Sequence, residues 1–327
     1  MLRTFLALLV LVPNIITAQD NPNYNPDYDA DGCYSISDIL GLLPQFGVCP
    51  NNPSEVNNGF SGSSVNFWYD PDFNGDGCYS AIDVIGLLPL FGNCWACGDP
   101  VLFDSLWYGT VSIGNQCWFT SNLQTTAYAN GDLIQTGMTG EEWASTTEGA
   151  TAIVSEDYEC DNNQSPGIDV CDGEEALSAF GRLYNGYAVE DARGLCPSGW
   201  QVPADSDWLD MELQSGVPFS ELFEELTYRG TSTNAGNRLK STDGWLDVGM
   251  EWTVGTDEFQ LTALPGGLRN LSGDSMHAGA LGYWWSSTGA GNMKVWTRTL
   301  SASSSGINRT RLSVQHGLSV RCLREAE

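Results

Sequence analysis

Two stretches of the chain carry oxygen-bearing side chains at alternate positions, a pattern that suits a hard metal ion. The first reads DYDADGCYSISD from Asp27 to Asp38, and the second reads DFNGDGCYSAID from Asp72 to Asp83. Calcium prefers roughly six to eight oxygen ligands, and a loop of about 12 residues supplies them from positions 1, 3, 5, 7, 9 and 12. The sequence therefore predicts two calcium loops, each binding one Ca²⁺ ion, two ions in all.

The expected ligands are carboxylate, amide and hydroxyl side chains together with one backbone carbonyl per loop. In the first loop they are Asp27, Asp29, Asp31, the carbonyl of Cys33, Ser35 and Asp38, and in the second they are Asp72, Asn74, Asp76, the carbonyl of Cys78, Ser80 and Asp83. Glycine stands at the sharply turning sixth position of both loops. An Asp/Gly-rich turn without metal is the alternative interpretation, and the duplication makes the calcium interpretation the stronger one.

A short apolar helix is expected directly after each loop. The apolar positions are Ile39, Leu40, Leu42, Leu43 and Phe46 in the first copy, and Val84, Ile85, Leu87, Leu88 and Phe91 in the second. Pro44 and Pro89 limit each helix to two or three turns, and Gly47 and Gly92 end them. We expect the two helices to bury their apolar stripes against each other. The tyrosine at the eighth loop position is expected to pack less deeply than the usual aliphatic residue.

This loop–helix pair resembles the dockerin type I repeat, in which no helix precedes the loop and aspartate stands at position 12. The resemblance implies two bound calcium ions and docking onto a cohesin-like or other cell-surface protein. Dockerins often attach carbohydrate-active enzymes to a scaffold. The cysteines of each copy and the long spacer depart from the usual dockerin pattern. Aspartate at position 12 favours a static structural site over a switch.

Composition points to an exported, acidic protein. Among 327 residues, Asp and Glu total 41 and Lys and Arg total 13, so we expect neither nucleic acid nor anionic lipid as a partner. Residues 1–18, with Arg3 before an apolar run, are expected to be a signal peptide. No later apolar stretch is long enough for a membrane span. We therefore expect a secreted or cell-surface-associated protein with residues 19–97 as one domain and 98–327 as another.

The cysteine count fits an oxidising compartment, because ten cysteines in an exported chain imply disulfides. Equal spacing in the two repeats favours one bridge inside each. The expected pairs are Cys33–Cys49, Cys78–Cys94, Cys97–Cys117, Cys160–Cys171 and Cys196–Cys322. The CxxC sequence from Cys94 to Cys97 is interpreted as structural and not as a redox motif.

Beyond residue 98 the sequence favours an irregular α+β domain. Short strands are expected at Thr110–Ile113, Phe259–Thr262 and Leu318–Arg321. Helices are expected to begin at Asp205, where acidic residues fill the first turn, and to cover Phe219–Leu226. The fold class expected for the whole chain is thus multidomain, a small α calcium-loop–helix pair followed by a loop-rich α+β domain.

Several blocks in this second part resemble the Fibrobacter succinogenes major paralogous domain. They include VSIGNQCW from Val111, GRLYN from Gly181, LCPSGWQVP from Leu195, NRLKS from Asn237, ALPGG from Ala263, YWWSST from Tyr283 and SVRC from Ser319. The same blocks are similar to the sulfatase-modifying-factor type of C-type-lectin-like fold. The resemblance implies a compact domain whose ends meet, with Cys196 and Cys322 as the clasp. Most of its tryptophans are expected in the core and not on a sugar-stacking surface.

We find no sequence motif that selects a catalytic site. There is no GxSxG, HExxH or phosphate loop, and His277 and His316 are the only histidines. The leading hypothesis is a non-catalytic, secreted calcium-binding protein for adhesion, whose lectin-like domain contacts a glycan or a surface protein. The alternative is a dockerin-borne component of an extracellular polysaccharide-degrading system.

Overall fold

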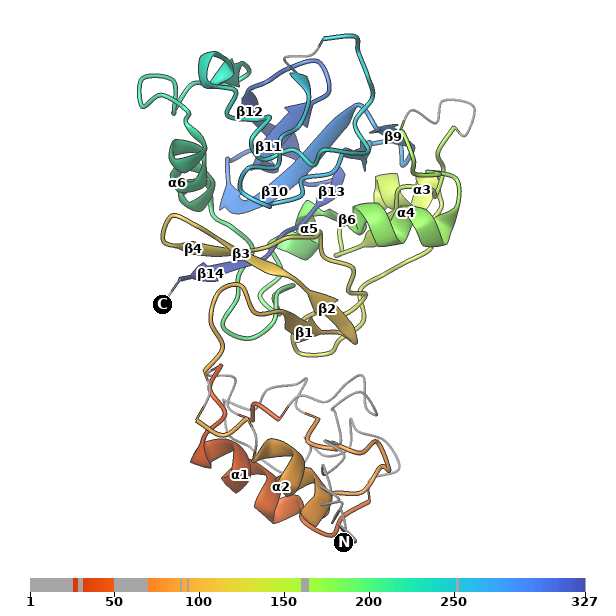
Figure 1. Ribbon diagram of the computed structural model, residues 1–327. Helices are drawn as coiled ribbons and strands as arrows, with labels where there is room; N and C mark the ends of the chain where they lie inside the picture. The colour runs from red at the N-terminus through yellow and green to blue at the C-terminus, as the bar shows by residue number, and fades with distance from the viewer. Residues whose placement is uncertain are drawn as a thin grey trace, which may run out of the picture. The chain divides into compact units, whose positions relative to one another are not determined.

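The computed structural model describes residues 26–28, 32–49, 70–88, 90–92, 94–159, 165–250 and 253–326. The chain divides into two compact units, one that ends at Cys94 and one that starts at Trp95 (Figure 1). The expected signal peptide lies outside the described residues. No helix in the described ranges combines the length and the apolar character that crossing a bilayer requires.

The N-terminal unit contains two short helices that lie side by side (Figure 1). Helix α1 spans Ile36–Leu42 and continues into the 3₁₀ helix η2, Leu43–Gln45, and helix α2 spans Ala81–Leu87. Leu42 and Leu87 are both buried. Because each helix has only seven residues, its stability comes from its N-cap and from packing and not from length.

A glycine in each helix makes room for the aromatic residue at the second loop position. A Cβ atom added at Gly41 would overlap the Tyr28 ring, and one added at Gly86 would overlap the Phe73 ring. Phe73 is buried. Each loop therefore rests on its own helix through a ring-on-glycine contact, and the two copies repeat this contact.

The disulfides of this unit join the two repeats, so the expected pairs inside each repeat are wrong. Cys33 is bonded to Cys94 and Cys49 to Cys78. The end of each repeat lies against the loop of the other, since Gly47 N donates to Tyr79 O (2.7 Å) and Gly92 N donates to Tyr34 O (2.7 Å). This exchange brings each C-terminal cysteine to the loop cysteine of the opposite copy. The expectation for Tyr79 is also wrong, because its side chain is buried at 3% exposure.

The C-terminal unit is rich in β-structure, with several sheets and few helices among the described residues. Its strands are β1 (Val101–Phe103), β2 (Leu106–Tyr108), β3 (Thr110–Ile113), β4 (Gln116–Phe119), β5 (Thr151–Ile153), β6 (Arg182–Asn185), β7 (Tyr228–Arg229), β8 (Gly266–Arg269), β9 (Ser275–Ala278), β10 (Leu281–Gly289), β11 (Lys294–Ser301), β12 (Ile307–Ser313), β13 (Gly317–Ser319) and β14 (Leu323–Glu325). Its helices are α3 (Gly140–Ser145), α4 (Gly173–Phe180), α5 (Gly186–Val189), α6 (Asp205–Ser215) and the 3₁₀ helix η5 (Thr231–Thr233).

A nine-stranded sheet forms the centre of this unit, in the order β5-β6-β13-β8-β10-β11-β12-β7, with β9 paired to β8. The long strands β10, β11 and β12 are antiparallel neighbours (Figure 1). Helix α6 begins at Asp205 as expected and ends at Gly216, which adopts the left-handed conformation. Its Trp208 and Met211 pack into a core cluster that also contains Trp118 and Trp284.

The expectation of buried tryptophans is confirmed in part, because Trp200 and Trp245 are only half-buried. Trp118, Trp208, Trp284 and Trp285 are all less than 5% exposed, and the Trp208 and Trp285 indole nitrogens donate to backbone carbonyls. Burial with a satisfied N–H is the usual state of a core indole.

The two ends of the C-terminal unit meet in a three-stranded sheet, β14-β4-β3, as the resemblance implied (Figure 1). The expected disulfides Cys97–Cys117 and Cys196–Cys322 are both present. Cys171 is also disulfide-bonded, whereas its expected partner Cys160 lies outside the described residues.

Two expected elements are absent, because the backbone groups there serve other partners. Residues 219–226 form turns instead of a helix: the Leu222 carbonyl accepts from Arg229, and the Phe223 carbonyl accepts from Arg309. Residues 259–262 form no strand, since the carbonyls of Leu261 and Thr262 accept from the Arg321 guanidinium. Of the third expected strand, 318–321, only residues 318–319 lie in β13.

Candidate functional site

The loop that precedes α2 wraps its backbone around the Asp72 carboxylate. Asp72 accepts hydrogen bonds from Gly77 N (2.7 Å) and Asp76 N (3.2 Å), and Gly77 has the positive φ (+76°) that the sixth position requires. The loop that precedes α1 repeats this contact, with Gly32 N donating to Asp27 at 3.0 Å. The first carboxylate of each loop thus shapes the loop around itself.

The last carboxylate of the second loop ties both ends of that loop together. Asp83 accepts from Phe73 N at 2.9 Å through one oxygen and from Ser80 N at 2.6 Å through the other. The Ser80 side chain in turn accepts from the backbone at the start of α2, so Ser80 and Asp83 form a reciprocal capping box. Asp83 has no exposed area. Its burial at the helix N-terminus is compensated by these backbone donors and by the helix dipole.

The first loop has the same arrangement around Asp38. This carboxylate accepts from Tyr28 N at 2.7 Å and from Ser35 N at 2.6 Å, and Ser35 and Asp38 form a capping box at the start of α1. Asp38 is 1% exposed. The predicted ligands Asp29 and Asp31 of this loop lie outside the described residues.

The side-chain oxygens of Asn74 and Asp76 in the second loop accept hydrogen bonds from backbone N–H groups two residues further along. Asn74 Oδ1 accepts from Asp76 N (3.3 Å), and Asp76 Oδ1 accepts from Cys78 N (2.8 Å). Burial raises the pKa of Asp72, and the charges of Asp83 and Asp76 raise it further. Negative charge is therefore concentrated between these side chains.

No cluster of three or more His, Cys, Asp or Glu side chains with the geometry of a metal site occurs in the ranges that the structure describes. The second loop combines its three carboxylates with oxygens of other kinds, the Asn74 amide, the Ser80 hydroxyl and the Cys78 carbonyl. Oxygen donors of all these kinds are ligands for calcium.

The N-terminal unit exposes apolar side chains at the same positions in both repeats. Its members are matched residues of the two repeats, each between 45% and 60% exposed: Leu40 with Ile85, Leu43 with Leu88, and Phe46 with Phe91. The expected burial of these residues between the helices is wrong: they are exposed, and Leu42 and Leu87 occupy the buried side. We call these six residues the repeated apolar surface. A grouped exposed apolar surface is typical of an interaction site.

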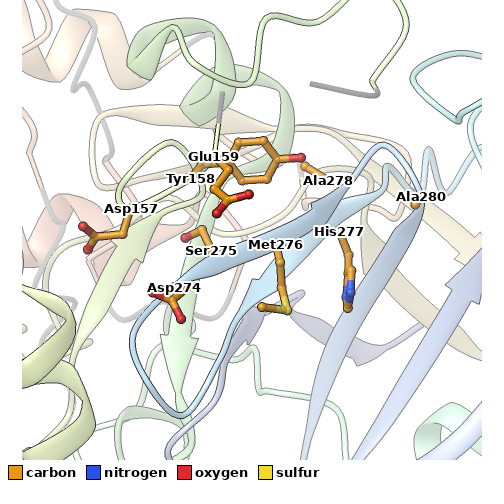
Figure 2. A pocket seen from close by; sticks show the side chains of 9 residues that line it. All are labelled: Asp157, Tyr158, Glu159, Asp274, Ser275, Met276, His277, Ala278 and Ala280. Atoms are coloured by element: carbon orange, nitrogen blue, oxygen red, sulfur yellow. The ribbon is translucent and has the colours of Figure 1, made fainter. Parts of the chain in front are cut away.

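The C-terminal unit contains a cavity of about 390 Å³ beside β9 that the sequence did not reveal. Figure 2 shows the nine side chains that line it: Asp157, Tyr158, Glu159, Asp274, Ser275, Met276, His277, Ala278 and Ala280. An isolated bridge between Tyr158 and Ser275 brings the loop after β5 alongside β9. Cavities of roughly 300–1,000 Å³ are the usual size for small-ligand sites.

One residue that lines the same cavity, His277, has a strained backbone conformation. His277 adopts φ +69°, a conformation that is costly for a residue with a Cβ atom and that clusters at functional sites. Its Nδ1 lies 3.3 Å from the Tyr283 hydroxyl, and the two rings stack with centroids 6.3 Å apart. Loss of hydration lowers the pKa of His277. A lone histidine and scattered acids carry no recognisable spacing, so no sequence motif pointed to this site.

The other buried charged groups of this unit have structural roles. Lys240 has no exposed area and donates to the carbonyls of Thr253, Ser301 and Ser304. Asp205 accepts from Arg298 (2.8 Å) and Arg309 (2.7 Å). These partners of Lys240 and Asp205 are protein groups, and both residues have a structural role.

Comparison with curated proteins and with solved structures returned no match. Comparison with protein families matched residues 111–324 to the Fibrobacter succinogenes major domain. The matched range runs from β3 to β14, so it includes the large sheet, the cavity beside β9 and the paired ends of the unit. It covers more than half of the chain. The chain therefore belongs to the Fibrobacter succinogenes major domain family.

Proposed function

We propose that this chain is a secreted, calcium-binding and non-catalytic binding protein. The N-terminal repeats bind two Ca²⁺ ions, and the C-terminal domain, which we propose is C-type-lectin-like, contacts a glycan at the cavity beside β9. The observation that carries the calcium proposal is the convergence of buried carboxylates in a loop with a left-handed glycine. Asp72 and Asp83 are 7% and 0% exposed and interact electrostatically.

The residues present fit a calcium ion. A carboxylate has about four lone-pair sites, so backbone N–H donors use only part of the capacity of Asp72 and Asp83. In the second loop Asp72, Asn74, Asp76, Ser80, Asp83 and the Cys78 carbonyl would hold the ion, and in the first loop the matching residues would do so. A bound cation would neutralise the carboxylates and stabilise the loop, because the repulsion that raises the pKa of Asp72 would be relieved.

Calorimetric titration of the full-length mature protein with Ca²⁺ tests this proposal. We expect two ions per chain in the wild type and one in the Asp72→Asn variant, together with a calcium-dependent rise in the melting temperature of the N-terminal unit. Asp210→Asn is the matched control, because Asp210 is an exposed acid on α6 outside both loops. Absence of binding heat and of thermal stabilisation in the wild type would refute the calcium proposal.

The repeated apolar surface favours a second proposal, in which the N-terminal unit docks onto a partner protein. The same three apolar positions are exposed in both repeats, so a partner domain can be bound by either repeat in the same way. We infer that the partner is a cohesin-like domain and that the chain is a component of a polysaccharide-degrading system. This partner is a protein with an apolar patch of its own, because the docking surface offers apolar side chains from two short helices.

Replacement of both Leu43 and Leu88 by Lys tests the docking proposal. We expect each single variant to retain binding of the purified partner and the double variant to lose it, because either repeat suffices. The partner is first isolated from the surface proteins of the producing cells by calcium-dependent capture and is then purified for direct titration. Full binding by the double variant would show that the repeated apolar surface is not the docking site.

A further inference from the structure

The cavity beside β9 carries an excess of negative charge. Three of its lining residues are carboxylates, Asp157, Glu159 and Asp274, and none of the lining residues is Lys or Arg. Asp157 is partly neutralised by the fully buried Arg269, whose Nη2 lies 2.7 Å from Asp157 Oδ2. Asp274 accepts a hydrogen bond from the neutral Asn270 amide (3.0 Å) and also interacts electrostatically with Arg269, so one guanidinium is the counter-charge of both Asp157 and Asp274. The field inside the cavity therefore favours cations.

A buried hydroxyl in the same cavity has an unused hydrogen-bonding capacity. Ser275 is 5% exposed, and its Oγ has no hydrogen-bond partner among the described residues. Figure 2 shows the Ser275 side chain on the side of β9 that faces Glu159. Buried polar atoms are nearly always paired, so an unpaired one inside a cavity points to a ligand. A hydroxyl is both donor and acceptor, and it suits a ligand that has hydroxyl groups of its own.

The cavity is also lined by apolar side chains and by a histidine whose ring is held by a neighbouring tyrosine. Tyr158 and Met276 present apolar surface to the cavity, and His277 is held at the rim by its contact with Tyr283. His277 has its pKa lowered by burial, so near neutral pH its ring adds no positive charge against the carboxylates. The cavity thus combines anionic acceptors, one free hydroxyl and an aromatic ring.

We propose that this cavity binds an amino sugar through its protonated amine. The inference rests on the proposed function, glycan contact by the C-terminal domain, and narrows it to glycans that carry a free amine. Glu159 and Asp274 accept hydrogen bonds from the ammonium group, Ser275 Oγ bonds a ring hydroxyl, and Tyr158 contacts the apolar face of the sugar. A neutral or acetylated glycan lacks the charge that the carboxylates select.

Three β-1,4-linked disaccharides that differ only at carbon 2 test the proposal: those of glucosamine, N-acetylglucosamine and glucose. Calorimetric titration of the full-length protein measures each affinity. We expect the glucosamine disaccharide to bind at least about ten-fold more tightly than the other two, because hydrogen bonds to charged groups are stronger than neutral ones. Its affinity also falls as salt concentration rises, since the contact is electrostatic.

Variants locate this binding in the cavity and separate it from general attraction to an acidic protein. Glu159→Gln and Asp274→Asn each weaken binding of the glucosamine disaccharide by about ten-fold, whereas Asp210→Asn removes an exposed charge elsewhere and leaves the affinity unchanged. Ser275→Ala weakens binding and does not lower the melting temperature, because the hydroxyl has no hydrogen-bond partner in the described part of the chain. Circular dichroism confirms the fold of each variant.

The outcomes distinguish this inference from the proposed function. If the three disaccharides bind with equal affinity, and the Tyr158→Ala variant binds none of them, the amine selectivity is overturned. The proposed glycan binding by the cavity then remains. Selective binding that Glu159→Gln and Asp274→Asn do not change overturns the assignment to this cavity. If no disaccharide binds and a wider glycan array is also negative, the proposed glycan contact fails together with the inference.

Discussion

Arg229 on β7 and Glu212 on α6 form an ion pair that is closed to solvent. Arg229 Nη2 lies 2.7 Å from Glu212 Oε1, and neither side chain has exposed area. Arg298 on β11 donates to the same carboxylate oxygen. One buried acid thus serves two buried guanidinium groups, and it connects the helix to both of these strands.

Removal of this acid is expected to be strongly destabilising. Glu212→Ala leaves Arg229 and Arg298 buried without their shared carboxylate, which costs about 3–5 kcal/mol of unfolding free energy. Urea denaturation of the full-length protein measures the change. Asp210→Asn on the exposed side of the same helix is the control and changes stability by about 0.5 kcal/mol or less. A loss below about 1 kcal/mol in Glu212→Ala would contradict the structural role of the pair.

Lys240 gives the stability of the domain a specific pH dependence. Burial lowers the pKa of Lys240 to about 8 in the folded state, against 10.5 as its ordinary value. Between these two pH values the unfolded chain binds more protons than the folded chain, so stability rises with pH, by at most about 1.4 kcal/mol per unit. Below pH 8 both states are protonated, and the group adds no slope.

Comparison with Lys240→Met isolates this effect from the titration of other groups. The variant leaves three carbonyls without their donor and is less stable than the wild type at pH 7 by about 1–3 kcal/mol. The difference in unfolding free energy between the two proteins increases from pH 8 to pH 10. Parallel pH profiles for wild type and variant would refute the lowered pKa.

The exchanged disulfides are open to direct chemical mapping. Digestion without reduction is expected to yield peptides that link Cys49 to Cys78 and Cys33 to Cys94. Replacement of both Cys49 and Cys78 by Ala lowers the stability of the N-terminal unit by about 3 kcal/mol, because the bridge closes a loop with a sequence separation of 29. A peptide that joins Cys33 to Cys49 would contradict the exchange.

The ring-on-glycine contact predicts a compensating pair of substitutions. Gly86→Ala places a methyl group in the volume of the Phe73 ring and costs about 1–3 kcal/mol. In the background of Phe73→Ala the same substitution costs less, because the clash is absent. Thermal unfolding of the four proteins of this double-mutant cycle measures the coupling. Additive effects would show that the ring does not lie over the glycine.

The sequence predicted best where local chemistry decides the structure. The start of α6 follows from its acidic first turn, and the helices after the two loops follow from the loop pattern and the apolar runs behind it. The blocks around Cys196 and Cys322 predicted that the ends of the C-terminal domain meet. These features depend on residues that are close in sequence or on blocks of recognisable composition.

The failures concern partners that are distant in sequence. Spacing alone does not distinguish a bridge inside a repeat from one between repeats, and the contact of Gly47 with Tyr79 decides the pairing. Residues 219–226 form turns because Arg229 and Arg309 occupy the carbonyls of two of them. The cavity beside β9 arises where Tyr158 meets Ser275, two residues that no local pattern connects.

The bond between Cys33 and Cys94 also determines how mechanical load passes through the N-terminal unit. If a partner holds α1 and a ligand holds the C-terminal domain, as proposed above, tension enters the unit at Cys94. The disulfide carries this tension straight to Cys33, just before the cap of α1. The intervening chain, with a sequence separation of 61, is bypassed. Pulling on the anchored protein therefore loads a covalent link and not the folded loops.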